Sequence, residues 1–103
     1  MSYFPDRLKV TVGAEVVLSV RSDEGRVDEY TFERQIFDQM IQAVDIKSDV
    51  WEGPEELRVK VQESKKRASL SIRVSQTKRE VHRVDLSNFM LMVAQYHSQA
   101  RGG

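Results

Sequence analysis

Hydrophobic residues occupy alternate positions in two segments near the start of the chain: Leu8, Val10, Val12, Val16, Leu18 and Val20. A period of two is typical of a β-strand that buries one face. The pattern therefore predicts strands at residues 7–12 and 16–20. A third strand is predicted at 27–32, after a tight turn at 22–25 that is rich in Ser, Asp and Gly.

The hydrophobic period lengthens after Glu33 and becomes that of a helix. The apolar positions that share one stripe are Ile36, Phe37, Met40, Ile41 and Val44. We therefore predict an amphipathic helix that ends near Asp45. Residues 45–54 contain turn formers and a Gly-Pro pair, which indicates a connection.

The same order of elements then returns, with strands predicted at 57–61, 70–74 and 81–86 and a helix at 87–97. Residues 7–12 match 56–61, 18–20 match 70–72 and 27–32 match 81–86, at offsets of 49, 52 and 54. Both third strands share an irregular spacing of apolar residues: Val27, Tyr30 and Phe32 in one, Val81, Val84 and Leu86 in the other. This spacing predicts a bulge in each.

The two halves, at about 7–45 and 56–98, predict a single α+β domain over 1–103 in which a β-β-β-α unit occurs twice. Two unrelated modules are the alternative. A duplicated chain would form one six-stranded antiparallel sheet, or two three-stranded sheets in pseudo-twofold arrangement, with both helices on the apolar face. The residues predicted on the open face are Lys9, Thr11, Ser19, Arg21, Arg58, Lys60, Gln62, Ser69, Ser71, Arg73 and Ser75.

The composition excludes several classes of protein. The chain has a mean hydropathy of −0.50, and its longest apolar run, 89–94, is too short to span a membrane. The absence of cysteine excludes disulfides, thiolate nucleophiles and zinc fingers. The first residues lack the basic and apolar segments of a signal peptide, so we expect a cytoplasmic protein.

Motifs for catalysis and for cofactors are absent from the sequence. There is no G-x-S-x-G, no glycine-rich phosphate loop, and neither H-x-x-x-H nor H-E-x-x-H. The two histidines, His82 and His97, are interpreted as ordinary surface or capping groups. We therefore predict a protein that is not an enzyme, with no catalytic residue, no cofactor and no metal.

The charge is uneven although it sums to zero. Residues 1–54 hold six basic and eleven acidic residues, whereas 55–103 hold ten and five. Chance scatter over a solvated surface is one explanation. The other is a local polyanion site, because ten positions in 58–83 are Lys, Arg or His and two are acidic. The residues predicted to bind nucleic acid are Arg58, Lys60, Lys65, Lys66, Arg67, Arg73, Lys78 and Arg79.

Aromatic residues do not alternate into that basic face, although single-strand binding usually uses base stacking. Tyr30 is predicted to belong to the core. Trp51 is either a plug over the connection, which we favour, or an exposed interface residue. In the second helix the consecutive apolar residues 89–93 surround more than one face, so Met90 and Leu91 are predicted to form a homodimer interface. The alternative is that this helix is the centre of the core.

The second half, in which strands and basic turns lead through VDLSNFMLMVAQY into a helix, resembles the repeats of the Pur-alpha and Whirly single-stranded nucleic-acid-binding proteins. The resemblance is one of pattern, over about 56–98 and more faintly over 7–45. It implies binding of single-stranded DNA or RNA. Those families have four strands per repeat, where three are predicted here, and aromatic residues on the binding face.

Two functions are therefore expected. The first is non-enzymatic binding of single-stranded nucleic acid through the basic sheet face. The second is that of a small protein-binding adaptor or inhibitor, of the kind that phages and mobile elements encode, which docks through its acidic first half or its apolar second helix. Neither function involves a membrane.

Overall fold

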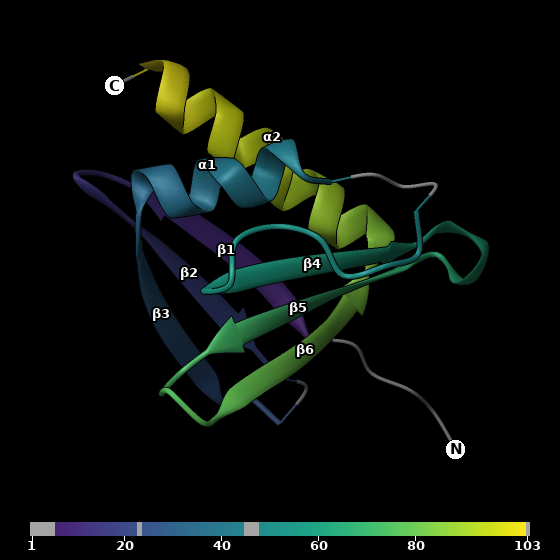
Figure 1. Ribbon diagram of the computed structural model, residues 1–103. Coiled ribbons are helices and arrows are strands. Elements are labelled where there is room, and N and C mark those ends of the chain that lie inside the picture. Colours follow the sequence, from purple (N-terminus) through teal and green to yellow (C-terminus); the bar gives the residue numbers. More distant parts are fainter. Residues whose placement is uncertain (1–5, 23, 45–47, 103) are drawn as a thin grey trace.

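Residues 6–22, 24–44 and 48–102 are described in the computed structural model (Figure 1). The first half contains β1 (Arg7–Val12), β2 (Glu15–Arg21), β3 (Val27–Glu33) and α1 (Arg34–Gln42). The second half contains β4 (Leu57–Gln62), the single turn η1 (Glu63–Lys65), β5 (Arg67–Arg73), β6 (Arg79–Asp85) and α2 (Leu86–Gly102). The predicted α+β class is confirmed, and its order of elements is consistent with a repeated β-β-β-α unit.

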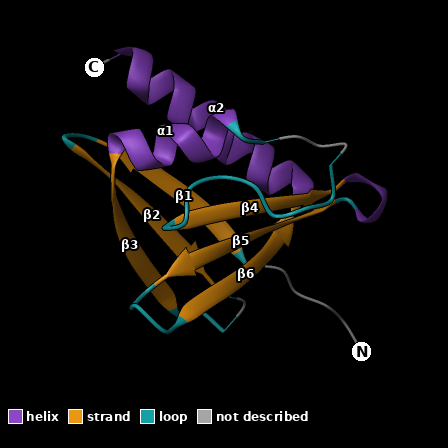
Figure 2. Cartoon of the chain, viewed as in Figure 1, coloured by secondary structure: helices purple, strands orange, loops and turns teal. Residues whose placement is uncertain are grey.

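The strands form two separate antiparallel sheets, β1-β2-β3 and β4-β5-β6, rather than one six-stranded sheet. Each sheet is a simple meander, because consecutive strands are joined by short turns and pair as neighbours. Figures 1 and 2 show both helices on the same side of the two sheets. No helix in the described part of the chain is long and apolar enough to cross a membrane.

Strand register relates the two halves and corrects one part of the predicted match. Val10 pairs with Leu18 in the first sheet, and the equivalent Val59 pairs with Leu70 in the second. Leu18 then pairs with Tyr30, whereas Leu70 pairs with His82, so the third strands match at an offset of 52 and not 54. Residues 27–32 therefore correspond to 79–84.

The predicted bulge in each third strand is wrong. Both β3 and β6 pair with their neighbours without a skipped residue over their whole length. Val27 and Val81 consequently lie on the outer faces, where they are 53% and 51% exposed. Their apolar character misled the sequence-based register, because the inward positions of these strands hold polar residues instead.

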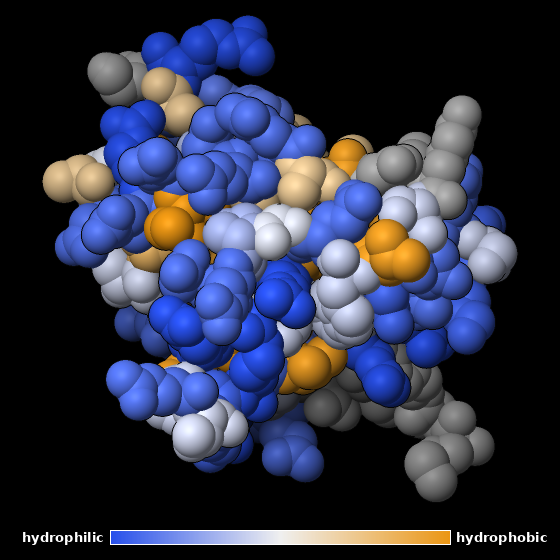
Figure 3. All heavy atoms as spheres, viewed as in Figure 1, coloured by the Kyte–Doolittle hydropathy of each residue, from blue (hydrophilic) through white to orange (hydrophobic). Residues whose placement is uncertain are grey.

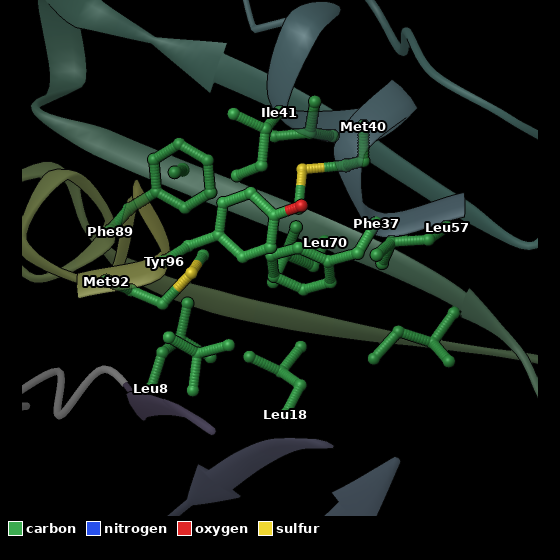
Figure 4. Close-up of a cluster of buried hydrophobic side chains, with 14 of the residues drawn as sticks. Leu8, Leu18, Phe37, Met40, Ile41, Leu57, Leu70, Phe89, Met92 and Tyr96 are labelled. Atoms are coloured by element: carbon green, nitrogen blue, oxygen red, sulfur yellow. The ribbon is translucent and has the colours of Figure 1, made fainter. Parts of the chain in front are cut away.

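The core lies between the inner faces of the two sheets and the apolar sides of both helices. Figure 4 shows side chains from all of these elements meeting there, including Phe37 of α1 and Phe89 of α2. The most extensive helix–strand contacts cross between the halves. Helix α2 contacts β1 more than it contacts any other strand, and α1 contacts β4 more than it contacts any other strand. Each helix therefore covers part of the other half's sheet, so neither half has a complete core of its own.

The helix ends differ from the sequence prediction. Helix α1 ends at Gln42 with Ala43 as its C-cap, and Asp45 lies outside the described residues. Helix α2 continues beyond His97 to Gly102. The extension has a partner: the Gln99 side chain accepts a hydrogen bond from the Val12 N–H at 2.8 Å and donates one to the Val10 carbonyl at 3.0 Å. It thus supplies hydrogen bonds to the edge of β1 that a neighbouring strand would otherwise provide.

Candidate nucleic-acid interface

The basic surface is the outer face of β4-β5-β6, which we call the basic face. Cross-strand pairing places Lys60, Ser69 and Arg83 in one row of this face. The next row holds Arg58, Ser71 and Val81. Figure 3, viewed with these strands in front, shows a largely hydrophilic surface with small separate hydrophobic patches. The strands thus present fixed cations on both sides of a serine-lined central strand.

Ser69 and Ser71, the two central serines, were predicted to lie open to solvent, and this prediction is wrong. Ser69 is 3% exposed and Ser71 is 6% exposed. The cause is the small side chain of serine on a central strand, between neighbours that carry long ones. Arg79, for example, reaches across to Ser71, donating from Nε to the hydroxyl at 2.7 Å and from Nη2 to the carbonyl at 3.1 Å.

The remaining predicted cations lie toward the two ends of the face. Lys65 belongs to η1, and Lys66 follows it with a left-handed backbone, φ 51°. Lys78 lies in the turn between β5 and β6, at the opposite end. Arg67 and Arg73 begin and end β5, which separates the two groups by roughly 20 Å at about 3.3 Å per residue.

Some of the predicted binding residues already have partners within the protein, and Arg73 and Arg79 are among them. Arg73 forms ion pairs with Glu55 at 3.4 Å and Glu56 at 3.7 Å. Arg79 is held against Ser71, so its guanidinium is oriented along the face. Two carboxylates therefore offset the charge of Arg73. Arg79 keeps its charge, but two of its N–H donors are engaged by Ser71.

Arg83 belongs to the basic face although the sequence did not single it out as a binding residue. It is exposed and lies in the same row as Lys60, on the far side of β5. Neither Arg83 nor Arg58 forms an ion pair with any residue that the structure describes. These two arginines therefore retain their full charge for an anionic ligand.

Trp51 lies at the edge of the basic face, and the prediction that it is a buried plug is wrong. Its neighbour Glu52 pairs with Val59, the two exchanging backbone hydrogen bonds of 2.8 Å each. Because side chains alternate along an extended segment, this pairing puts Trp51 on the same face as Lys60. The residue is 38% exposed, and the Lys60 ammonium lies 5.1 Å from the centre of its ring.

The backbone beside Trp51 requires a glycine. Gly53 has φ +110°, a conformation that L side chains rarely adopt. A Cβ atom at this position would also lie 2.9 Å from the Leu57 carbonyl oxygen, which is too close. The Trp-Glu-Gly sequence is the one signal that could have indicated the pairing, since Gly allows the chain to approach β4 closely.

A cluster of polar groups on the inner side of the sheets was not expected from the sequence. The Tyr30 hydroxyl donates to the Glu80 carboxylate and lies 2.9 Å from Nε2 of His82. The other ring nitrogen of His82, Nδ1, is 3.0 Å from the Asp6 carboxylate. The interpretation of His82 as a surface group is therefore wrong, since its side chain is only 13% exposed.

The cluster connects the two sheets, because Tyr30 belongs to β3 whereas Glu80 and His82 belong to β6. Burial and then the hydrogen bond to Glu80 raise the pKa of Tyr30, which keeps its hydroxyl protonated. That single proton is donated to Glu80, which leaves the Tyr30 oxygen as an acceptor facing Nε2 of His82. Among the described residues, no three His, Asp or Glu side chains are arranged to hold a metal ion.

The exposed side of α2 carries the residues predicted to form an interface. Met90 and Leu91 are 42% and 57% exposed, while Phe89 and Met92 are fully buried. Met90 and Leu91 are therefore accessible on the surface, and the homodimer interface stays a prediction. A shallow depression farther along the helix is lined by Ala94, His97, Ser98 and Arg101. This side of the helix is thus a second surface with apolar character.

Comparisons of the chain with models of protein families, with curated proteins and with solved structures find no match. The resemblance to the Pur-alpha and Whirly repeats therefore stays an expectation from the sequence pattern.

Proposed function

We propose that this protein binds single-stranded nucleic acid, without catalysing a reaction, through the basic face. The observation that carries the proposal is the position of Trp51. It joins an exposed aromatic ring to the cations of Arg58, Lys60 and Arg83 on one surface. Cations that track a backbone, combined with aromatic rings for the bases, are the usual basis of single-strand binding.

The spacing of the cations suits an extended phosphate backbone. Arg58 and Lys60 are two residues apart on β4, which separates their Cα atoms by about 6.8 Å. Neighbouring phosphates of an extended single strand have a similar separation. Lys65 and Lys66 at one end of the face and Lys78 at the other would extend the contact beyond the fixed cations. Flexible lysines in turns adapt to the backbone as point charges.

The measurement is the affinity for a fluorescently labelled oligonucleotide at two salt concentrations. With about four phosphate contacts, we expect roughly 50-fold weaker binding at 200 mM than at 50 mM salt. The test variant is Arg58→Glu, Lys60→Glu and Arg83→Glu together, which should abolish binding at the higher salt concentration. Circular dichroism should show an unchanged fold, since exposed substitutions change stability by about 0.5 kcal/mol or less.

A matched control is available on the outer face of the other sheet. Arg7, Lys9 and Arg21 are all exposed there, and reversing them to Glu changes the net charge by the same amount. Binding that survives in this control and is lost in the test variant supports the basic face. Equal loss in both variants contradicts the proposal, because it indicates attraction by net charge alone.

A second function is favoured by one observation, the exposure of Met90 and Leu91 on α2. This surface suits a protein partner, either a second copy of the chain in a homodimer or a target of a small adaptor or inhibitor. A pull-down after nuclease treatment distinguishes the two functions. Recovery of protein alone supports the adaptor, and loss of all bound material after nuclease supports nucleic-acid binding. Under either function we place the protein in the cytoplasm.

A further inference from the structure

We propose that Trp51 is a stacking platform for one unpaired nucleobase, and that the cations of the basic face bind only phosphates. This inference rests on the proposed function and adds the part of the ligand that Trp51 contacts. It predicts a ligand that must have bases as well as charge. It also predicts that duplexes, whose bases are already stacked, bind more weakly than single strands.

Among the Phe, Tyr and Trp rings in the described part of the chain, Trp51 is the exposed one. The rings of Phe32, Phe37, Phe89 and Tyr96 are buried in the core. Tyr30 points inward to the polar cluster between the sheets. His97 is also exposed, but it lies on α2, so Trp51 is the aromatic ring available for stacking on the basic face.

The contact with Lys60 explains why the ring suits a nucleotide in particular. The ammonium lies within cation–π distance of the ring, at 5.1 Å from its centre, which helps to hold the indole at the edge of β4. The same ammonium can pair with the phosphate next to a stacked base. A nucleotide carries a flat aromatic base and an anionic phosphate that are separated by one sugar. The Trp51 ring can stack on the base while the Lys60 ammonium pairs with the phosphate.

The platform is held in place before any ligand binds. The Glu52–Val59 backbone hydrogen bonds fix the segment that carries the ring against β4. Gly53 permits the close approach that this pairing needs. A ring on an ordered segment loses less conformational entropy on binding than one on a free loop.

The surroundings of the ring predict little choice between sequences. The hydroxyl-bearing residues of the neighbouring rows, Ser69 and Ser71, are buried, and Ser71 already accepts a hydrogen bond from Arg79. These two serines are therefore not free to read the edges of bases. Stacking itself is tolerant of sequence because every base has an aromatic face.

Trp51 is the only tryptophan of the chain, so its fluorescence reports on this site directly. The first experiment compares an oligonucleotide with an abasic one of the same length and charge, using the wild-type protein. We expect quenching of the tryptophan fluorescence and tighter binding with the normal oligonucleotide only. Equal affinity for the two, with no quenching, overturns the inference and leaves the proposed function intact. Absence of binding to both overturns the proposed function itself.

The second experiment uses variants of the ring. Trp51→Ala should weaken binding of the normal oligonucleotide by roughly 5- to 150-fold and leave binding of the abasic one unchanged. Trp51→Phe retains a smaller ring, so its affinity for the normal oligonucleotide should lie between those of the wild type and Trp51→Ala. A merely structural role for the residue predicts equal losses for both ligands and would contradict the inference. The comparison of ligands on the wild-type protein remains decisive if a variant fails to fold.

Discussion

The contribution of the polar cluster to stability can be tested by removing one group, the Tyr30 hydroxyl. Tyr30→Phe keeps the ring and removes the oxygen that donates to Glu80 and contacts His82. A hydrogen bond to a charged group contributes about 1.5–3 kcal/mol. The lower end of this energy range applies here, because the Glu80 side chain is 32% exposed and water can replace part of the contact. We therefore expect the free energy of unfolding to fall by about 1.5 kcal/mol.

The assay is urea unfolding followed by circular dichroism at pH 7, supported by the melting temperature. For a domain of this size the loss corresponds to a decrease of roughly 6–12 °C. Tyr96→Phe is the matched control. Its hydroxyl makes a longer contact of 3.4 Å with Asp38, so the same chemical change should cost less than half as much. Equal losses in both variants, or none for Tyr30→Phe, would refute the role given to the cluster.

Ionisation of the Tyr30 hydroxyl should also make the free energy of unfolding depend on alkaline pH. Burial and the hydrogen bond to Glu80 raise the pKa of Tyr30 above its ordinary value of 10.0. Above about pH 10 the unfolded chain loses this proton while the folded chain keeps it. The unfolded state then binds fewer protons, so the free energy of unfolding falls as pH rises. The fall should be shallower in Tyr30→Phe, measured by urea unfolding between pH 8 and 11.

Two further predictions concern the backbone beside Trp51 and the exposed side of α2. Gly53→Ala should destabilise the protein more than Gly25→Ala, because both glycines have positive φ but only Gly53 would bring a Cβ atom against a backbone oxygen. We expect at least about 1–3 kcal/mol by urea unfolding for the former, and equal losses would contradict the clash. Changing Met90 and Leu91 together to Gln should yield a folded monomer by light scattering, if the wild type is a dimer at about 100 μM. A monomeric wild type or an unfolded variant would contradict the dimer.

The sequence predicted the strands well where polar and apolar residues alternate on a simple inside-outside pattern. It failed in β3 and β6, where Val27 and Val81 face outward and the inward positions hold His82 and Glu80. Those inward groups are tolerated because they bind one another and Tyr30 across the two sheets. A contact between residues so far apart in the chain leaves no trace in local periodicity.

The candidate site was predictable only where it depends on local sequence pattern. The density of Lys and Arg in the second half indicated a basic face, and alternation placed Arg58 and Lys60 on it correctly. The ion pairs that occupy Arg73 depend on how the chain enters β4, which composition does not report. The placement of Trp51 depends on a single backbone pairing outside the regular strands.

The packing of α2 along β1 has a consequence for the order in which the protein can be made. The Leu8 N–H is satisfied by Asn88, and the Val12 N–H by Gln99, 80 and 87 residues later in the chain. At about 5–20 residues per second, a ribosome needs roughly 4 s or more to reach those partners after adding β1. During synthesis the first sheet therefore has an unprotected edge and an incomplete core. The contacts that cover the edge of β1 can form only after the last turns of α2 have left the ribosome. A nascent chain stalled short of them should therefore be prone to aggregate.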